Sequence, residues 1–455
     1  MKNSIEKIET VHYNLIMKYW NGDLEMKKEI LSNVKKQMEE FLVKSVNFWL
    51  DNGIDEECGG YLVCFDEHGN PMKSLEVMKP SDKMIVTQSR MIWGFSALLR
   101  NGMAEKYGWV EKCKKTASQG VDFFIEKFWD KENGGFAWYT DRNGVVQDNG
   151  KLVYGQTFAI YALSEYALAT GDERAREYAE KTFDLLLKYC VDTSNGGFYE
   201  NLTEDWVPEI DVNKGGNLKS LDIHMHAMEA FTTLYECTRK ENHKRKLKEV
   251  IDIIMKHMVD YNFDCGCNQF TYDFKRKAAR EICRTWNYDR APENANRNPR
   301  DTTSYGHNIE LIWLLNRAYS IMGEMPAREL TKKFADYTLR NGWDYVYGGI
   351  FRDGMHDGRV VVTDKEWWQN FESLTGLLDS YQVIGEEEYL KKFVELWKFD
   401  KEYFYNEEVG ESRQLLKANG EPIIADTGNQ WKCIYHTDRA MMECIPRLDE
   451  ILSKM

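Results

Sequence analysis

The stretch NGGFAWYTDRNGV at residues 133–145 decides the fold, because related stretches recur along the chain. In each, a glycine pair or its remnant precedes an apolar residue and a turn sequence such as Asp-Arg-Asn-Gly, which predicts a small β-hairpin. Their glycines lie roughly 60 to 80 residues apart, which leaves room for a pair of helices in each unit. Clear copies begin at Cys58, Asn133, Asn195 and Tyr347, and degenerate copies begin at Gly266 and Gly410.

The segments between these stretches have the apolar periodicity of helices, and only 8 prolines interrupt the chain. Helix pairs that alternate with hairpins predict an all-α fold, a closed (α/α)6 barrel with its short β-hairpins at one end over a central cavity. The clearest predicted helices span residues 151–170, 172–190, 221–239, 305–322 and 367–384.

Two segments fall outside the repeat. Residues 1–28 predict an extra N-terminal helix, followed by a single barrel domain at residues 29–455. Residues at about 276–303 are polar and contain two prolines, which predicts an inserted loop. The loop is interpreted either as an element that shapes a binding site or as a plain surface insertion.

The composition indicates a large packed protein that binds neither nucleic acid nor a membrane. Of its 455 residues, 43% are hydrophobic and 13% aromatic, and the net charge is -14. That acidic excess argues against a basic face for polyanions. No apolar run reaches the roughly 18 residues of a membrane span, and the first residues lack the apolar core of a signal peptide. We therefore predict a cytoplasmic protein whose 10 cysteines are free thiols.

Four clusters combine histidine, arginine, acidic and aromatic residues. The first, SRMIW, contains Arg90 inside a helical pattern, for which a paired core charge is the alternative interpretation. In the second, Asp222, His226 and Glu229 lie at spacings of four and three and therefore share one helix face. The others pair a histidine with a charged residue three positions later. These later clusters contain Asp222, His226 and Glu229; His307 and Glu310; and His436 and Arg439.

A metal centre is not expected from these clusters. An HExxH motif is absent, and a di-iron site would need two further carboxylates. Cys265 and Cys267 form one close pair, whereas a zinc site would need a second pair. Two histidines in different clusters are better suited to proton transfer, one removing a proton from carbon and the other delivering one. Arg90 would then hold the oxyanion that forms between these steps.

At these motifs the sequence resembles the N-acylglucosamine 2-epimerase superfamily, and especially its cellobiose (mannobiose) 2-epimerase branch. The resemblance extends from about residue 30 to the C-terminus and implies an (α/α)6 barrel. It also implies cofactor-independent epimerisation at C2 of a reducing sugar through a cis-enediolate. The matching motifs are SRMIWGFSALL, KFWDKENGGFAW, LVYGQTFAIYALSEY, DIHMHAMEAFTTLY, SYGHNIELIWLL, WWQNFESLTGLL and QWKCIYH.

The resemblance also assigns roles to residues. It implies that His307 and His436 are the two catalytic histidines, and that Arg90 and Glu310 are further catalytic residues. Four tryptophans offer aromatic faces of the kind that stack on sugar rings, although tryptophan is also common in protein cores; they are Trp93, Trp367, Trp368 and Trp431. The expected substrate-binding residues are Tyr154, Asp222, His226, Trp368, Glu372 and Trp431.

The sequence departs from the family pattern at three places, which bear on the substrate. Asp222 stands where the cellobiose branch typically has asparagine, and an ionised carboxylate cannot donate a hydrogen bond. Phe371 replaces a residue that is usually small, and the insertion at 276–303 has no counterpart in short family members.

The leading prediction is a sugar 2-epimerase that acts on a cellobiose-like disaccharide, without metal or cofactor, as a monomer or homodimer. Alternatives are an aldose–ketose isomerase similar to mannose isomerase, and an N-acylglucosamine 2-epimerase. A glycoside hydrolase on the same barrel would instead use Glu310 and Glu372 as its carboxylate pair. A sugar-binding protein without catalysis is the last alternative.

Overall fold

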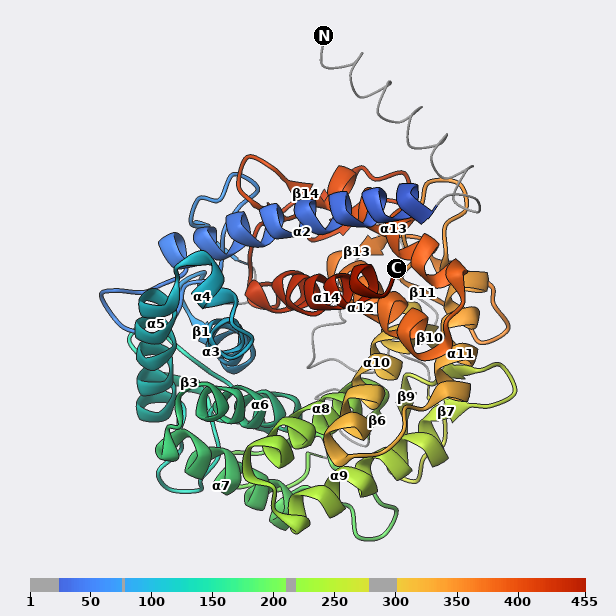
Figure 1. Ribbon diagram of the computed structural model, residues 1–455. Coiled ribbons are helices and arrows are strands. Elements are labelled where there is room, and N and C mark those ends of the chain that lie inside the picture. The colour runs from blue at the N-terminus through green and yellow to red at the C-terminus, as the bar shows by residue number, and fades with distance from the viewer. Residues whose placement is uncertain (1–23, 76–77, 210–217, 278–300) are drawn as a thin grey trace.

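The computed structural model describes residues 24–75, 78–209, 218–277 and 301–455 (Figure 1). Within these residues the chain is mostly helical, and its strands form no closed sheet. The predicted helix at 1–28 lies outside them except for its last residues, which begin α2 (Leu24–Asn52). Most of the predicted insertion at 276–303 also lies outside the described residues.

One set of helices surrounds the centre of the molecule (Figure 1). In chain order each packs against the next, and the last packs against the first. Most residues of these helices are buried, as expected for helices that are covered on several sides. The inner set consists of α3 (Ile85–Arg100), α6 (Val153–Thr170), α8 (Leu221–Thr238), α10 (Tyr305–Met322), α12 (Trp367–Ile384) and α14 (Ile434–Lys454).

A second set of helices lies outside the first (Figure 1). In the order below they pack against α3, α6, α8, α10, α12 and α14. Their outward faces are polar, so that only one stripe of each is buried, as in α7, where Ala175, Ala179 and Phe183 face inward. The outer set consists of α5 (Val110–Phe123), α7 (Glu173–Tyr189), α9 (Glu241–Ile253), α11 (Arg328–Tyr337), α13 (Glu387–Phe399) and α2; the short α4 (Met103–Tyr107) precedes α5.

The predicted helices agree closely with these bounds. Residues 305–322 and 367–384 coincide with α10 and α12. The helix predicted at 151–170 begins two residues late, because Lys151 and Leu152 pair as a strand with Leu202 and Asn201.

The strands are short and antiparallel, and they precede or connect the helices. The hairpin predicted at residues 133–145 forms, and its turn is closed by the Asp141 N–H, which donates to the Val145 carbonyl at 2.8 Å. The strands are β1 (Lys83–Met84), β2 (Tyr139–Thr140), β3 (Val146–Asp148), β4 (Lys151–Leu152), β5 (Asn201–Leu202), β6 (Lys219–Ser220), β7 (Val259–Asp260), β8 (Cys265–Gly266), β9 (Gln269–Phe270), β10 (Thr302–Ser304), β11 (Asp353–Met355), β12 (Val360–Val362), β13 (Lys365–Glu366), β14 (Tyr405–Asn406), β15 (Glu411–Ser412), β16 (Leu415–Leu416) and β17 (Pro422–Ile424).

The fourth copy of the repeat has a different register from the prediction. Gly266 pairs with Val259, as Phe136 pairs with Trp129 after the glycine pair of the second copy. Asp264, with φ of 60°, therefore takes the place of the first glycine, and Cys265 takes the place of the second. The prediction that Gly266 represents the glycine pair was wrong, because the backbone pairing and not the glycine itself defines the position.

A buried lysine precedes most of the inner helices by two residues and pairs with an aspartate that follows an outer helix. Each ammonium is thereby neutralised inside the protein, as a buried charge must be. The pairs are Lys83 with Asp55, Lys151 with Asp130, Lys219 with Asp192 and Lys365 with Asp344, with 2.7–3.0 Å between Nζ and Oδ2.

Two further predictions concern the whole chain. Among the described residues, every helix is too short or too polar to cross a bilayer. The cysteines of the described ranges are free thiols.

Candidate active site

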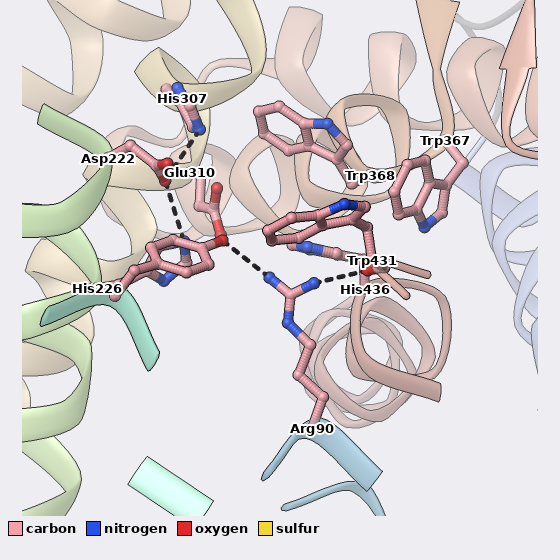
Figure 2. A pocket seen from close by; sticks show the side chains of 10 residues that line it. Arg90, Asp222, His226, His307, Glu310, Trp367, Trp368, Trp431 and His436 are labelled. Carbon is pink, nitrogen blue, oxygen red and sulfur yellow. Dashed lines mark hydrogen bonds and ion pairs between the residues drawn. The ribbon is translucent and has the colours of Figure 1, made fainter. Parts of the chain in front are cut away.

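A small pocket lies where the inner helices begin. Every inner helix, or the residues just before it, contributes at least one side chain, from the first two turns. The N-terminal ends of these helices, with their positive dipole ends, therefore face a common space, which favours a bound anion. The lining residues are Arg90, Tyr154, Asp222, His226, His307, Glu310, Trp367, Trp368, Trp431 and His436 (Figure 2).

On one side of the pocket, His436 is held from behind by Glu372. The ring Nδ1 lies 2.7 Å from Glu372 Oε1. Burial, together with the nearby cations Arg90 and Arg439, holds the pKa of His436 well below its ordinary value. The imidazole is therefore neutral near pH 7, which is the form that accepts a proton.

Glu372 receives donors from several directions. Arg439 donates from Nε at 3.1 Å, and Trp313 Nε1 donates at 3.2 Å. Burial raises the pKa of Glu372, and Arg439 opposes that shift. Because these N–H groups point at the carboxyl oxygens, Glu372 acts as an acceptor, the hydrogen of His436 lies on Nδ1, and Nε2 is left to act as a base.

Arg439 lies behind the pocket and connects three acidic side chains. Its Nη2 lies 2.6 Å from Oε1 of both Glu310 and Glu372, and its Nη1 contacts Glu229. The guanidinium is 1% exposed and lies over the ring of Tyr435 at 4.1 Å. One buried cation therefore balances three carboxyl groups, which come from α8, α10 and α12.

On the opposite side, Asp222 connects two histidines (Figure 2). Its Oδ1 lies 3.3 Å from His226 Nε2 and 3.4 Å from His307 Nε2. His226 Nδ1 lies 2.9 Å from Glu229. Burial lowers the pKa of His226, but hydrogen bonds with Asp222 and Glu229 outweigh it and raise the pKa to about 9. This ring is therefore protonated at neutral pH.

Arg90 enters the pocket from α3. Its Nη1 donates to the Trp431 carbonyl at 2.7 Å, and its Nη2 donates to the Tyr154 hydroxyl at 3.1 Å. The guanidinium also lies over the rings of Phe158 and Tyr435, at 4.5 and 4.7 Å from their centroids. These contacts fix a buried cation whose charge faces the pocket.

Trp368 contacts both of the histidines predicted to be catalytic. Its ring centroid lies 4.6 Å from that of His307 and 5.8 Å from that of His436. A planar substrate fragment held beside Trp368 would therefore lie within reach of two imidazoles that come from different helices.

The site also offers a possible metal-binding triplet. Oxygen or nitrogen atoms of Glu310, Glu372 and His436 lie within 4.8 Å of one another. Arg439 contacts both carboxylates, however, so that a guanidinium already supplies the positive charge at this position.

Nine of the ten site residues named from the sequence line the pocket. Glu372 is the exception: it is fully buried and contacts His436 from behind. Trp367, which the sequence offers as one of several aromatic faces, also lines the pocket. The sequence does not identify Tyr435 or the connecting role of Arg439. The spacing of His436 and Arg439 by three residues was visible, but it does not identify the partners of Arg439 on other helices.

Comparison with known proteins identifies the family of the chain. The N-acylglucosamine 2-epimerase (GlcNAc 2-epimerase) family matches residues 59–440. The cellobiose 2-epimerase of Dictyoglomus turgidum is 29% identical over 418 residues, which covers 89% of this chain and 96% of that protein. The D-mannose isomerase of Marinomonas mediterranea is 23% identical, with 91% and 98% covered. The structure of cellobiose 2-epimerase from Spirochaeta thermophila superposes with a TM-score of 0.77 at 25% identity, with 93% and 98% covered. The chain therefore belongs to the N-acylglucosamine 2-epimerase family of isomerases.

Proposed function

We propose that this protein is a sugar 2-epimerase that interconverts the C2 epimers of a reducing aldose, with a cellobiose-like disaccharide as its substrate. The observation that carries the proposal is the pair His307 and His436, which border one pocket and both lie beside Trp368. Relatives named cellobiose 2-epimerase support the choice of substrate.

The reaction needs two proton transfers at one carbon. In the open-chain sugar, Nε2 of His436 removes the C2 proton, and the electrons of the C–H bond form a C1–C2 double bond as the C1 carbonyl becomes an oxyanion. His307 then donates a proton to the other face of C2, and the C1 carbonyl forms again. The two rings exchange protons with water before the next turnover, and their roles reverse for the opposite epimer.

Arg90 and the helix N-termini stabilise the enediolate. The guanidinium is buried and fixed by Trp431 and Tyr154, so that little reorganisation is needed as the negative charge develops. No metal or cofactor takes part in the proposed chemistry.

The remaining predicted residues divide into sugar contacts and one positioning residue. Asp222 and Glu310 offer oxygen acceptors to sugar hydroxyls, and Trp431 offers a ring face. Glu372 lies behind His436, and we assign it the orientation of that ring rather than the direct sugar contact expected from the sequence.

We also propose that the helices form a closed (α/α)6 barrel. The contact between α14 and α3, which joins the last inner helix to the first, supports closure of the inner ring. The pairing of each inner helix with an outer helix supports the double layer.

An aldose–ketose isomerase is the second candidate, because the same enediolate can receive its proton at C1. The similarity to a D-mannose isomerase supports this alternative. An N-acylglucosamine 2-epimerase would differ only in the substituent that the pocket accepts at C2.

Proton NMR in deuterated water separates these reactions. Cellobiose, mannose, glucose and N-acetylglucosamine are each incubated with the protein. Deuterium at C2 with appearance of the C2 epimer is the expected result, and cellobiose is expected to react fastest. A ketose as the main product would replace the epimerase by the isomerase, and cleavage of the glycosidic bond would contradict both.

A further inference from the structure

The buried lysines Lys83, Lys151, Lys219 and Lys365 lie at an equivalent position in their copies of the repeat, at the hairpin end of the fold. We call this position, between the aspartate and the neighbouring hairpin, the lysine seat. Beside its aspartate, each of three ammonium groups donates to a carbonyl at the second position of a hairpin turn. A positive charge at this seat thus joins the start of an inner helix to the loop after an outer helix and to the neighbouring hairpin. The turn carbonyls belong to Arg142, Tyr272 and Ala418, and they accept from Lys83, Lys219 and Lys365 at 2.8, 2.7 and 2.6 Å.

The fourth copy has the aspartate of this seat without the lysine. Asp260 ends β7 in the same place as the other aspartates, since the Asp264 N–H donates to its carbonyl as the Gly59 N–H donates to that of Asp55. Two residues before α10, however, the chain has Thr303. The buried carboxylate of Asp260 must therefore be balanced by something other than a lysine.

Three other side chains point into the seat of the fourth copy. Cys265 stands in place of the second glycine, and Cys267 follows it. His356 occupies the second position of the turn between β11 and β12. At the corresponding position of another hairpin, Arg142 offers its carbonyl to Lys83 and its guanidinium to Asp55. His356 Nδ1 lies 3.0 Å from Asp260 Oδ2, and Cys267 Sγ lies within 4.8 Å of ligand atoms of both residues. Cys265 pairs with Asp260 between β7 and β8.

We propose that the fourth copy holds a zinc ion at Asp260, Cys267 and His356, with Cys265 as the fourth ligand. The ligand atoms of the first three lie within 4.8 Å of one another. Carboxylate oxygen, imidazole nitrogen and thiolate sulfur are the donors that zinc prefers, and four of them complete a tetrahedral structural site. All four side chains are buried, at 0–6% exposure.

The surroundings of His356 suit a metal ligand. Asp301 Oδ1 lies 3.4 Å from the buried Nε2 without forming a hydrogen bond, and Nδ1 faces Asp260 and the proposed ion. A small shift of Asp301 would let it hold the Nε2 hydrogen and support the metal ligand. Without the ion, Arg276 contacts two of the proposed ligand atoms, Asp260 Oδ2 at 2.6 Å and His356 Nδ1 at 3.5 Å. Its side chain is 41% exposed, so that it can turn outward when the ion enters, whereas the buried Arg439 behind the pocket cannot. The ion takes over the balance of charge that the lysines provide elsewhere.

The site would brace the start of α10. β11 pairs with β10, and β10 leads directly into the helix turn that carries His307. A metal that ties His356 to β7 and β8 therefore fixes the hairpin against this turn. The role is structural, and it does not depend on the proposed epimerase reaction.

Metal loading of the full chain tests the proposal. The protein is stripped with a chelator, dialysed against zinc or cobalt(II), and assayed for bound metal. We expect about one ion per chain, a thiolate-to-cobalt charge-transfer band, and a Tm that rises with zinc. Failure to retain either metal, with no change in Tm, would show that Arg276 and protonated His356 alone balance Asp260, and would overturn the proposal.

Matched variants locate the site. His356→Ala and Cys267→Ser are expected to lose the bound ion, whereas Cys190→Ser, which alters a buried thiol two residues before Asp192 of the third copy, retains it. Thr303→Lys restores the lysine of the repeat and is expected to fold, to bind no ion and to show no response of Tm to zinc. Equal metal binding by Thr303→Lys and the unaltered chain would contradict the proposal even if the other variants fail to fold.

Discussion

The two sides of the pocket hold their histidines by opposite electrostatics. His436 lies among cations, and its pKa is held low, so that the ring is neutral. His307 and His226 lie against the carboxylate of Asp222, and the pKa of His226 is raised to about 9. The comparison indicates that, before substrate binds, one side of the pocket holds a neutral base, His436, and the other holds a protonated histidine, His226, next to His307. Proton transfer at both faces of one carbon requires an acceptor on one side and a donor on the other.

Removal of either catalytic histidine should have the largest effect. His307→Ala and His436→Ala are each expected to lower epimerisation about 10²- to 10⁴-fold, the usual contribution of a general acid or base. In deuterated water each variant should still exchange the C2 proton of one epimer without inverting it, because the remaining histidine serves one face only. Proton NMR with both epimers as starting material measures this.

The exposed residue His68 provides the control, and His68→Ala should retain full activity. If His307→Ala exchanged the C2 proton of both epimers at the rate of the unaltered enzyme, the assignment of His307 to one face would be wrong.

Loss of Arg439 should destabilise the folded protein. Arg439→Met keeps the length of the side chain but leaves Glu229, Glu310 and Glu372 buried without their shared cation. We expect the free energy of unfolding to fall by about 3–5 kcal/mol, as when one member of a buried ion pair is removed. Urea denaturation measures it.

Arg359→Met is the matched control, because Arg359 pairs with Asp357 on the surface and its side chain is 74% exposed. Its loss should leave the free energy of unfolding almost unchanged, because a fully solvated ion pair contributes little. Equal losses for the two variants would mean that Arg439 does not stabilise the acidic cluster.

The sequence predicts the pocket better than it predicts what lies behind it. Pocket residues such as His307 fall in the first turns of helices whose periodicity is readable, and repeated helix pairs bring those turns together. The partners of Arg439 come from three other helices, far away along the chain. They are determined by packing across the centre, for which a single sequence carries no spacing signal.

The repeat itself shows the same limit. Glycine pairs correctly mark the first, second, third and fifth copies. In the fourth copy Asp264 and Cys265 occupy the positions of the glycine pair, and the nearby Gly266 predicts the wrong register. Asp264 reaches positive φ without glycine, as aspartate can. The fourth copy therefore has the same backbone pairing as the others although its sequence lacks the glycine pair.

A smaller effect should distinguish the roles of Glu372 and Glu310, which both contact Arg439. Glu372→Gln keeps an acceptor for His436 but removes its charge, so that the imidazolium formed during the reaction is less stable. We expect kcat to fall roughly tenfold, equivalent to about 1.4 kcal/mol, and the acid limb of its pH profile to move to lower pH.

Glu310→Gln removes a charge from the same arginine without contact with His436, so that the acid limb should stay in place and KM should change instead. Steady-state kinetics across pH distinguish the two. An identical pH shift in both variants would assign the effect to Arg439 rather than to the bond between Glu372 and His436.

The smallest effect concerns stability on the His307 side. The folded pKa of His226, about 9, lies above its ordinary value of about 6.5. Its contribution to stability is therefore fully present below about pH 6.5 and is lost as the pH rises through 9. Asp222→Asn removes one of the two carboxylates that raise this pKa, so that the loss should begin at lower pH. Unfolding free energies should differ by about 1 kcal/mol at pH 6.5, and the gap should narrow towards pH 10. A gap that stays constant across this range would show that Asp222 does not stabilise the charged ring, and the electrostatic contrast between the two sides would then rest on Glu229 alone.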